Sequence, residues 1–254
     1  MENVRVQIKT AVMLAAGMGQ RLRPYTEDRP KCLVPVAGKP LLAHTIDALE
    51  QAGFDRFVII TGYQHEKVDH FIDEYTGPLK IETIYNDQYH CTNNIYTLWF
   101  AGKYIHEAFV LIESDLIYDS KLLEMLRAPD RIALSLFDPT LHNGTRATIC
   151  DEGCLESLIT NEFEPENVKI YKTVNMASFS YPTWQELLIE LSNCIDGDGA
   201  HSFYEECIKS LVNKKKIKMK AIDFSDLWWD EIDSEDDLNR VNTHLASHYV
   251  FADQ

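Results

Sequence analysis

Residues 14–31 read LAAGMGQRLRPYTEDRPK and continue an apolar run, residues 11–14, that predicts a buried β-strand. Two glycines, Gly17 and Gly19, place a tight loop at the start of this stretch. Positively charged residues follow them, among them Arg21, Arg23 and Lys31. Glycine lets backbone N–H groups approach an anion without a Cβ in the way, and cations neutralise charge that grows in a transition state. The stretch therefore indicates a polyphosphate site.

The loop differs from the two common phosphate-binding motifs. A Walker A motif requires Gly-Lys-Ser or Gly-Lys-Thr, which does not follow here, and Leu22 stands where the dinucleotide fingerprint has its third glycine. A glycine-rich turn with solvated arginines is the alternative without a ligand. The complete string resembles the signature of the nucleotidyltransferases that make NDP-sugars and CDP-alcohols, G-x-G-x-R-L-x-P-x-T-x-x-x-P-K. Eight residues occupy its fixed positions: Gly17, Gly19, Arg21, Leu22, Pro24, Thr26, Pro30 and Lys31.

Length and composition favour a single α/β domain. The chain has 254 residues, of which 45% are hydrophobic, and this is enough for one sizeable core. A formal net charge of −16 makes nucleic acid and anionic membranes unfavourable partners. Residues 1–10 lack an apolar segment, no apolar run approaches about 18 residues, and the six cysteines are scattered. We therefore expect a cytoplasmic protein with reduced thiols, without a signal peptide or a transmembrane helix.

The first half of the chain alternates apolar runs with helical patterns. Strands are predicted at 11–15, 56–60, 80–85 and 108–112, and helices at 41–52, 66–75 and 94–105. This alternation is typical of a Rossmann-like α/β fold, a mostly parallel twisted sheet with helices on both faces. Because ligands of such sheets bind at the carboxyl ends of the strands, we expect the glycine loop, Thr61-Gly62 and Asp115 along one edge.

The second half predicts a smaller, mixed α+β lobe on the same sheet. Strands are expected at 131–137, 145–149, 154–159, 169–179 and 218–224, and helices at 182–191, 201–212 and 234–246. We expect a single domain over residues 1–254, in which about residues 1–130 bind the nucleotide. About residues 131–254 would form the acceptor-binding half and a closing helix. The resemblance of residues 14–31 implies that the whole is a GT-A-like nucleotidyltransferase fold.

Two aspartates are candidate metal ligands. Asp115 follows the predicted strand at 108–112, where phosphates would lie, and Mg²⁺ is usually held by one or two protein carboxylates. Judged without its neighbours, Asp115 could also be a turn residue at the end of a strand. Asp233 precedes the predicted last helix and could be its N-cap. The resemblance places Asp115 and Asp233 at the family's two metal positions and implies Mg²⁺ as the cofactor. Relatives often have a further Asp two residues before the first, where this chain has Glu113.

Residues 93–98 indicate the nucleotide. The Asn93-Asn94 pair precedes a helix and offers amides that can read a base edge, although capping is the alternative. The string Asn-Asn-x-Tyr-[Ser/Thr]-Leu, together with residues 171–175 and 229–233, resembles the cytidylyltransferase branch, whose products are CDP-choline-like or CMP-phosphonate-like. The resemblance therefore implies CTP. It assigns nucleotide binding to Leu14, Ala15, Ala16, Gly17, Gly19, Asn93 and Asn94.

The acceptor is inferred from the second half. Sugar-phosphate relatives carry a Glu-Lys-Pro string, whereas the nearest string here, residues 162–165, lacks the lysine, which argues against a sugar. The resemblance implies acceptor binding by Lys172, Asn175 and Trp229, although a lone strand lysine could simply be solvated. A box for an ammonium group could be formed by aromatic residues with one acid, unless these aromatics belong to the core. Its candidate members are Tyr89, Tyr204, Trp228 and Trp229 with Glu205 or Asp138.

These features together predict a Mg²⁺-dependent cytidylyltransferase. It would transfer CMP from CTP to a small phosphonate, preferentially 2-aminoethylphosphonate, and release pyrophosphate. The catalytic residues would be Lys31, Arg21, Asp115 and Asp233. The alternatives are a CTP:phosphocholine cytidylyltransferase, a sugar-1-phosphate nucleotidyltransferase that uses UTP or dTTP, and a non-catalytic nucleotide sensor. The sequence gives no oligomeric state.

Overall fold

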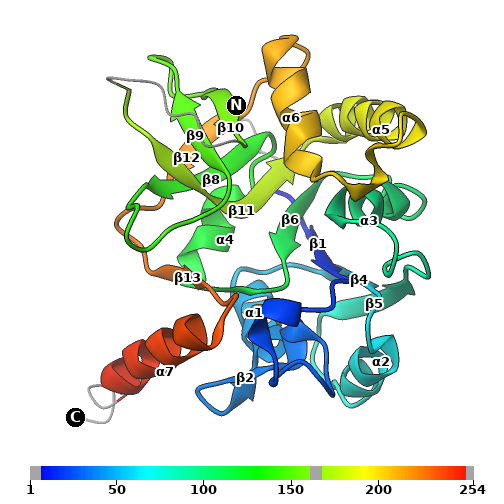
Figure 1. Cartoon of the computed structure of the whole chain (residues 1–254), viewed down its shortest axis with the longest axis vertical. Coiled ribbons are helices and arrows are strands. Elements are labelled where there is room, and N and C mark those ends of the chain that lie inside the picture. The colour runs from blue at the N-terminus through cyan, green and yellow to red at the C-terminus, as the bar shows by residue number, and fades with distance from the viewer. Residues whose placement is uncertain (1–6, 161–167, 250–254) are drawn as a thin grey trace, which may run out of the picture.

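A mixed sheet forms the centre of the molecule in the computed structural model, which describes residues 7–160 and 168–249 (Figure 1). Its order is β10-β9-β11-β6-β1-β4-β5, and β8 pairs with both β11 and β12. The strands are β1 (Thr10–Ala15), β4 (Arg56–Thr61), β5 (Lys80–Tyr85), β6 (Phe109–Glu113), β8 (Arg131–Leu136), β9 (Arg146–Ile149), β10 (Leu155–Ile159), β11 (Tyr171–Phe179) and β12 (Lys220–Asp223). Strands β6, β1, β4 and β5 are parallel, and β11 runs antiparallel to β6.

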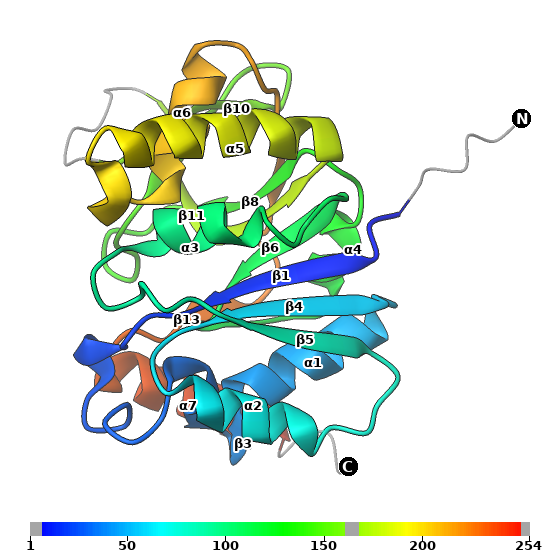
Figure 2. The same cartoon turned by 90° about the vertical axis from the view of Figure 1, so that its right-hand side faces the viewer.

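Helices cover both faces of this sheet, as the sequence predicts. They are α1 (Leu41–Gln51), α2 (His65–Asp73), α3 (Asn94–Ala101), α4 (Lys121–Leu126), α5 (Tyr181–Asp196), α6 (Tyr204–Asn213) and α7 (Glu235–Tyr249). Figure 2 shows α3 and α5 on one side of the sheet and α1 and α2 on the other. None of the helices in the described part of the chain combines the length and hydropathy needed to cross a bilayer.

Strand β1 is buried on both faces because its side chains alternate between two hydrophobic clusters. Val12 and Leu14 pack with α3, α5 and α6. Ala11 and Met13 pack with α1, α2 and α4 on the other face. This double burial holds the strand rigidly, and the glycine loop that follows it therefore begins from a fixed point.

A third, smaller cluster joins the two ends of the chain. Leu22, directly after the glycine loop, packs against Ile232 and against Leu238 of α7. The short strand β13 (Trp229–Glu231) precedes this helix and pairs antiparallel with β7 (Leu116–Tyr118). The backbone N–H of Ile232 donates to the carbonyl of Asp115 at 2.9 Å. These contacts bring the late acidic segment beside the carboxyl end of β6.

Several elements differ from the sequence prediction. The predicted helix at 94–105 ends at Ala101, and the one at 201–212 begins at Tyr204, after a 3-10 turn over Gly199–His201. Five short strands and helices were not predicted: β7, β13, α4, and the two strands of a hairpin, β2 (Pro35–Val36) and β3 (Lys39–Pro40). Strands of two or three residues carry too little periodicity to be recognised without their partners.

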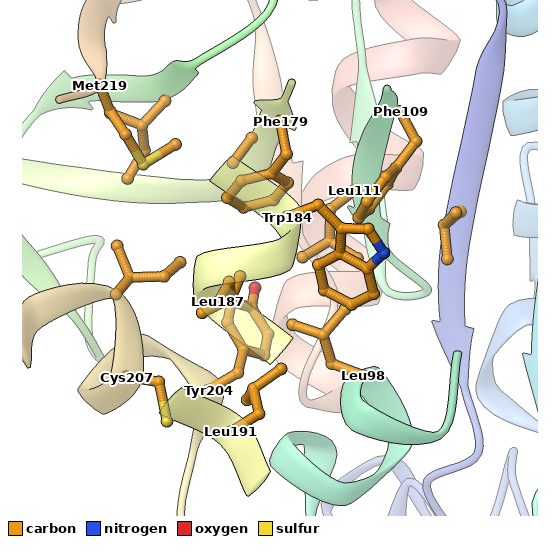
Figure 3. Close-up of a cluster of buried hydrophobic side chains, with 14 of the residues drawn as sticks. Leu98, Phe109, Leu111, Phe179, Trp184, Leu187, Leu191, Tyr204, Cys207 and Met219 are labelled. Carbon is orange, nitrogen blue, oxygen red and sulfur yellow. The ribbon is translucent and has the colours of Figure 1, made fainter. Parts of the chain in front are cut away.

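We predict that Trp184→Phe lowers the free energy of unfolding by about 2–3 kcal/mol. Trp184 is fully buried in the cluster of Figure 3. Its ring packs edge-to-face against Phe109, with the ring centroids 5.0 Å apart. Its indole N–H donates to the carbonyl of Ile105 at 2.9 Å, so phenylalanine would leave both a cavity and a missing donor. Urea denaturation measures the change. Trp99→Phe, which removes a half-buried donor to Ser192, is the control with a smaller expected loss, and equal losses would contradict the assignment.

Candidate active site

The signature loop forms one wall of a cavity of about 610 Å³ at the carboxyl ends of β1 and β6. Gly19 has a φ of +58°, and a Cβ on it would lie 3.1 Å from Thr26 Cγ2. The Thr26 hydroxyl is buried and donates to the Gly19 carbonyl at 2.7 Å. The glycine and threonine of the signature therefore fix one turn, while a Cβ on Gly17 would meet no atom within 4 Å. That open side faces the cavity, which Gly17 lines.

Lys31 joins the two predicted metal aspartates. Its Nζ lies 2.8 Å from Asp115 Oδ2 and 2.5 Å from Asp233 Oδ1. Burial by itself lowers the pKa of Lys31, but the two carboxylates outweigh burial and the pKa is raised. The largely exposed Arg21 reaches Asp233 Oδ1 at 2.9 Å. The structure thus brings together all four residues predicted to be catalytic.

A third carboxylate, Glu231, completes an acidic cluster with Asp115 and Asp233. One oxygen from each residue lies within 4.8 Å of the others. The Oδ1 atom of Asp115 is buried and has no hydrogen-bond partner among the described residues. Carboxylate oxygens are the ligands that hard divalent cations prefer, so this donor set fits such an ion. Glu231 was missed as a candidate, although its position two residues before Asp233 was a usable signal.

Asp233 does not use its side chain to cap α7. Asp237 Oδ2 accepts hydrogen bonds from the backbone N–H groups of Asp233 and Ser234 at 3.1 and 2.8 Å. The Ser234 hydroxyl in turn accepts from the Asp237 N–H at 3.3 Å, as in a capping box. Because Ser234 and Asp237 perform the capping, the Asp233 carboxylate is left for Lys31, Arg21 and a cation.

Glu113 lies beside the cluster and borders a second cavity as well as the first. Burial, and then the negative charges of Asp115 and Glu205, raise the pKa of Glu113 well above its usual range. The amide of Asn94 approaches Glu113 Oε1 at 3.5 Å. A carboxyl in such surroundings is stabilised in its protonated form or by a cation.

Asn93 and Asn94 both line the first cavity, and both amides are engaged within the protein. Asn93 Oδ1 caps α3 by accepting from the Asn94 N–H at 2.8 Å, and Asn93 Nδ2 donates to the His201 carbonyl at 3.2 Å. Asn94 Oδ1 accepts from the Tyr204 N–H at 3.2 Å. Asn93 is therefore the N-cap of α3. Recognition of a base edge by Asn93 and Asn94 stays a prediction. Leu14 and Ala16 also line this cavity, while Ala15 is buried in the opposite cluster.

The second cavity, of about 770 Å³, meets the first at the acidic cluster. Five residues line both cavities: Arg21, Asn94, Glu113, Asp115 and Asp233. Lys172 and Asn175 of β11 line the second cavity. Lys172 is not solvated, because its side chain is 2% exposed and its Nζ lies 3.3 Å from Glu231 Oε2. Asn175, with a φ of +56°, sits at a register shift of β11 and donates to Glu231 Oε1 at 3.2 Å.

The aromatic box considered from the sequence is not assembled. Trp228 stacks on His244 with a ring-centroid distance of 4.3 Å, and Tyr204 is buried in the core. Tyr89 lines the first cavity instead, and Asp138 binds Thr140. Trp229 stacks on His142 and lies 5.9 Å from Lys172 Nζ, outside the walls that the described residues give to the second cavity.

Of the residues considered for that box, Glu205 does line the second cavity. Phe203 and Arg146 of the same walls were not anticipated, and nothing in their local sequence marks them. Residues 162–165, the string nearest to the sugar-phosphate motif, lie outside the described residues.

Comparison with known proteins agrees with this geometry. The profile of the Nucleotidyl transferase family matches residues 10–140. The chain is 30% identical to "CMP-5'-(3-aminopropyl)phosphonate synthase" of Streptomyces rubellomurinus over 93% of its length, but covers 38% of that protein. It is 29% identical to "Bifunctional protein GlmU" of Methanococcus vannielii, covering 94% of the chain and 56% of that protein. The chain thus spans about half or less of these two relatives.

A solved structure gives the same fold over nearly the whole chain. "CTP:phosphocholine Cytidylyltransferase from Streptococcus pneumoniae (LicC)" matches with a TM-score of 0.79 and 23% identity, over 94% of this chain and 100% of that one. A "UDP-glucose pyrophosphorylase" matches with a TM-score of 0.78 and 14% identity, over 95% and 99%. These likenesses confirm the predicted GT-A-like, mostly parallel α/β fold. Together with the profile match over residues 10–140, they show that the chain belongs to the Nucleotidyl transferase family.

Proposed function

We propose that the protein transfers CMP from CTP to a small phosphonate and releases pyrophosphate, with 2-aminoethylphosphonate as the preferred acceptor. The observation that carries this proposal is the meeting of two cavities at one acidic cluster. Lys31, Asp115 and Asp233 line the first cavity, and both aspartates also line the second. A group transfer needs this arrangement, because donor and acceptor must approach one another at a shared point.

The division of the chain supports the two substrate sites. We assign the nucleotide to the first cavity, built mainly by residues up to about 130, and the acceptor to the second, built mainly by later residues. The names of two relatives favour a cytidine nucleotide with a phosphorus-containing amine. One is the synthase from Streptomyces rubellomurinus, and the other is "Choline-phosphate cytidylyltransferase" of Streptococcus pneumoniae, 23% identical over 93% of this chain and 98% of that protein.

The chain's own residues would align the reactants and neutralise charge. The acceptor is already an anion, so its phosphonate oxygen can attack the α-phosphorus without a strong base. Arg21 and the backbone N–H groups at Gly17 and Gly19 would hold the leaving β- and γ-phosphates. Lys31, kept charged by two carboxylates, would donate to the α-phosphate oxygens. Lys172 would face the acceptor's phosphonate from the second cavity.

The acidic cluster would hold Mg²⁺ through Asp115 and Asp233, with Glu231 close by. When bound, Mg²⁺ supplies positive charge to the phosphate oxygens and orients them. Asn175 would keep Glu231 in place through its 3.2 Å hydrogen bond.

A sugar-nucleotide synthesis is the second candidate, favoured by the similarity to GlmU and by the fold of UDP-glucose pyrophosphorylase. Pyrophosphate release with CTP, UTP, dTTP or ATP against 2-aminoethylphosphonate, phosphocholine or glucose 1-phosphate separates the candidates. We expect release with CTP and 2-aminoethylphosphonate. Release with a sugar phosphate alone would overturn the proposal. A folded protein that binds CTP but turns over no pair would instead be a nucleotide sensor.

We predict that Lys31→Ala and Asp115→Ala each lose at least about 10² in turnover while keeping the fold. Each change removes a charge that the proposed reaction needs at the α-phosphate. Pyrophosphate release and circular dichroism measure the two effects. Lys103→Ala is the control, because Lys103 is exposed and lies over the rings of Trp99 and Phe100. Near-normal turnover in either site variant would contradict the roles assigned here.

Metal binding gives an independent prediction. In the presence of CTP, Asp115→Asn and Asp233→Asn should weaken Mn²⁺ binding by about tenfold or more, because each removes one charged oxygen ligand. Electron paramagnetic resonance of free Mn²⁺ measures this without turnover. Asp226→Asn, at an exposed position, should bind Mn²⁺ like the wild type. Unchanged affinity in both site variants would remove the metal from the acidic cluster.

A further inference from the structure

We propose that Glu205 binds the ammonium group of the acceptor and makes the site selective for a primary over a quaternary ammonium. This inference rests on the proposed function, in which the acceptor is a small phosphonate. It concerns the end of the acceptor that carries the amine. Glu205 is the second residue of α6 and lines the second cavity, which also contains Lys172. One cavity thus offers a cation for the phosphonate and a carboxylate for an amine.

The strongest evidence is a buried oxygen of the Glu205 carboxylate that accepts no hydrogen bond. Glu205 Oε2 is buried and has no hydrogen-bond partner among the described residues. The side chain of Asn94 interacts with the same carboxyl group and acts against the rise of its pKa that burial causes. A buried carboxylate oxygen without a donor is costly, and native structures rarely leave one without a ligand or water. An ammonium N–H in the cavity would supply the missing donor.

The charges around Glu205 also favour a cation. Glu113 and Glu231 line the same cavity and interact electrostatically with Glu205, and Lys172 opposes their charge. Arg21 and Arg146 are further cations in the cavity walls. Lys172 Nζ lies 3.3 Å from Glu231 Oε2, so its charge is shared between that carboxylate and the proposed phosphonate. Burial raises the pKa of Glu205, and an adjacent ammonium would favour its ionised form. This part of the cavity therefore gains from one added positive charge.

The walls explain why a primary ammonium fits better than a trimethylammonium. A quaternary ammonium has no N–H and is usually bound by several aromatic faces. Phe137 and Phe203 are the aromatic residues that the described part of the chain contributes to the cavity walls. The Arg146 guanidinium lies 5.5 Å from the Phe137 ring centre and Phe203 is largely exposed, so neither completes a cage. A directed N–H donor matches the free carboxylate oxygen instead.

The test compares three acceptors with CTP: 2-aminoethylphosphonate, propylphosphonate, which has the same length but lacks the amine, and the longer phosphocholine. The variant is Glu205→Gln, which keeps the shape and removes the charge. We expect the ratio of kcat/KM for 2-aminoethylphosphonate to that for propylphosphonate to fall about 10- to 100-fold. Phosphocholine, with no N–H to donate, should be affected less. Glu186→Gln is the matched control, because Glu186 lines neither cavity and its carboxylate lies 3.3 Å from Lys216, and its ratio should stay at the wild-type value.

Two outcomes would overturn the inference. One is an unchanged acceptor ratio in Glu205→Gln, and the other is a wild-type preference for phosphocholine over 2-aminoethylphosphonate. If the wild type releases no pyrophosphate with any acceptor, the proposed function fails by itself. Calorimetric binding of 2-aminoethylphosphonate to the wild type and to Glu205→Gln then decides the inference separately. Weaker binding to the variant supports the ammonium site, and equal binding refutes it.

Discussion

The ion pairs of Lys31 with Asp115 and Asp233 are the contacts on which the site depends. They join three segments that are far apart in the sequence, with Nζ–O distances of 2.8 and 2.5 Å. Without this ammonium, the buried carboxylates and nearby Glu231 would repel one another, and such repulsion is strong away from bulk water. The same charge that the proposed reaction needs at the α-phosphate therefore also allows the acidic cluster to exist in the folded chain.

Hydrophobic packing and backbone pairing hold these charges in place. Leu22 of the signature packs against Ile232 and Leu238, so the phosphate loop and the last helix share a cluster. The β7–β13 pairing and the Ile232 N–H bond to the Asp115 carbonyl set the second aspartate beside the first. Since each contact lies within a few residues of a charged group, a loss of packing here would displace the charged groups of the site.

Much of the fold and the four candidate catalytic residues could be predicted, because their signals are local. The alternation through β1, β4, β5 and β6 follows from apolar runs separated by helical patterns. Lys31, Arg21, Asp115 and Asp233 follow from strings that place them near phosphates, and the structure brings them together. Lys172, Asn175 and Glu205 of the second cavity were named from the sequence. Phe203 and Arg146 could not be predicted, because they come from separate elements and are related only by the fold. The predicted aromatic box was wrong because Trp228 stacks on His244 and Tyr204 is buried in the core. The sequence does not reveal which aromatic residues pack inside the protein.

The two cavities are also connected through the start of α3. The Asn93 backbone N–H donates to the Ala200 carbonyl at 2.9 Å, and the Asn94 amide accepts from the Tyr204 N–H at the start of α6. Glu205 is the next residue of that helix, so residues of the first cavity help to determine its position. The proposed acceptor and nucleotide sites would therefore share one junction. Asn94 lines both cavities, so a change there would disturb both, whereas Glu205 lines the second cavity and not the first.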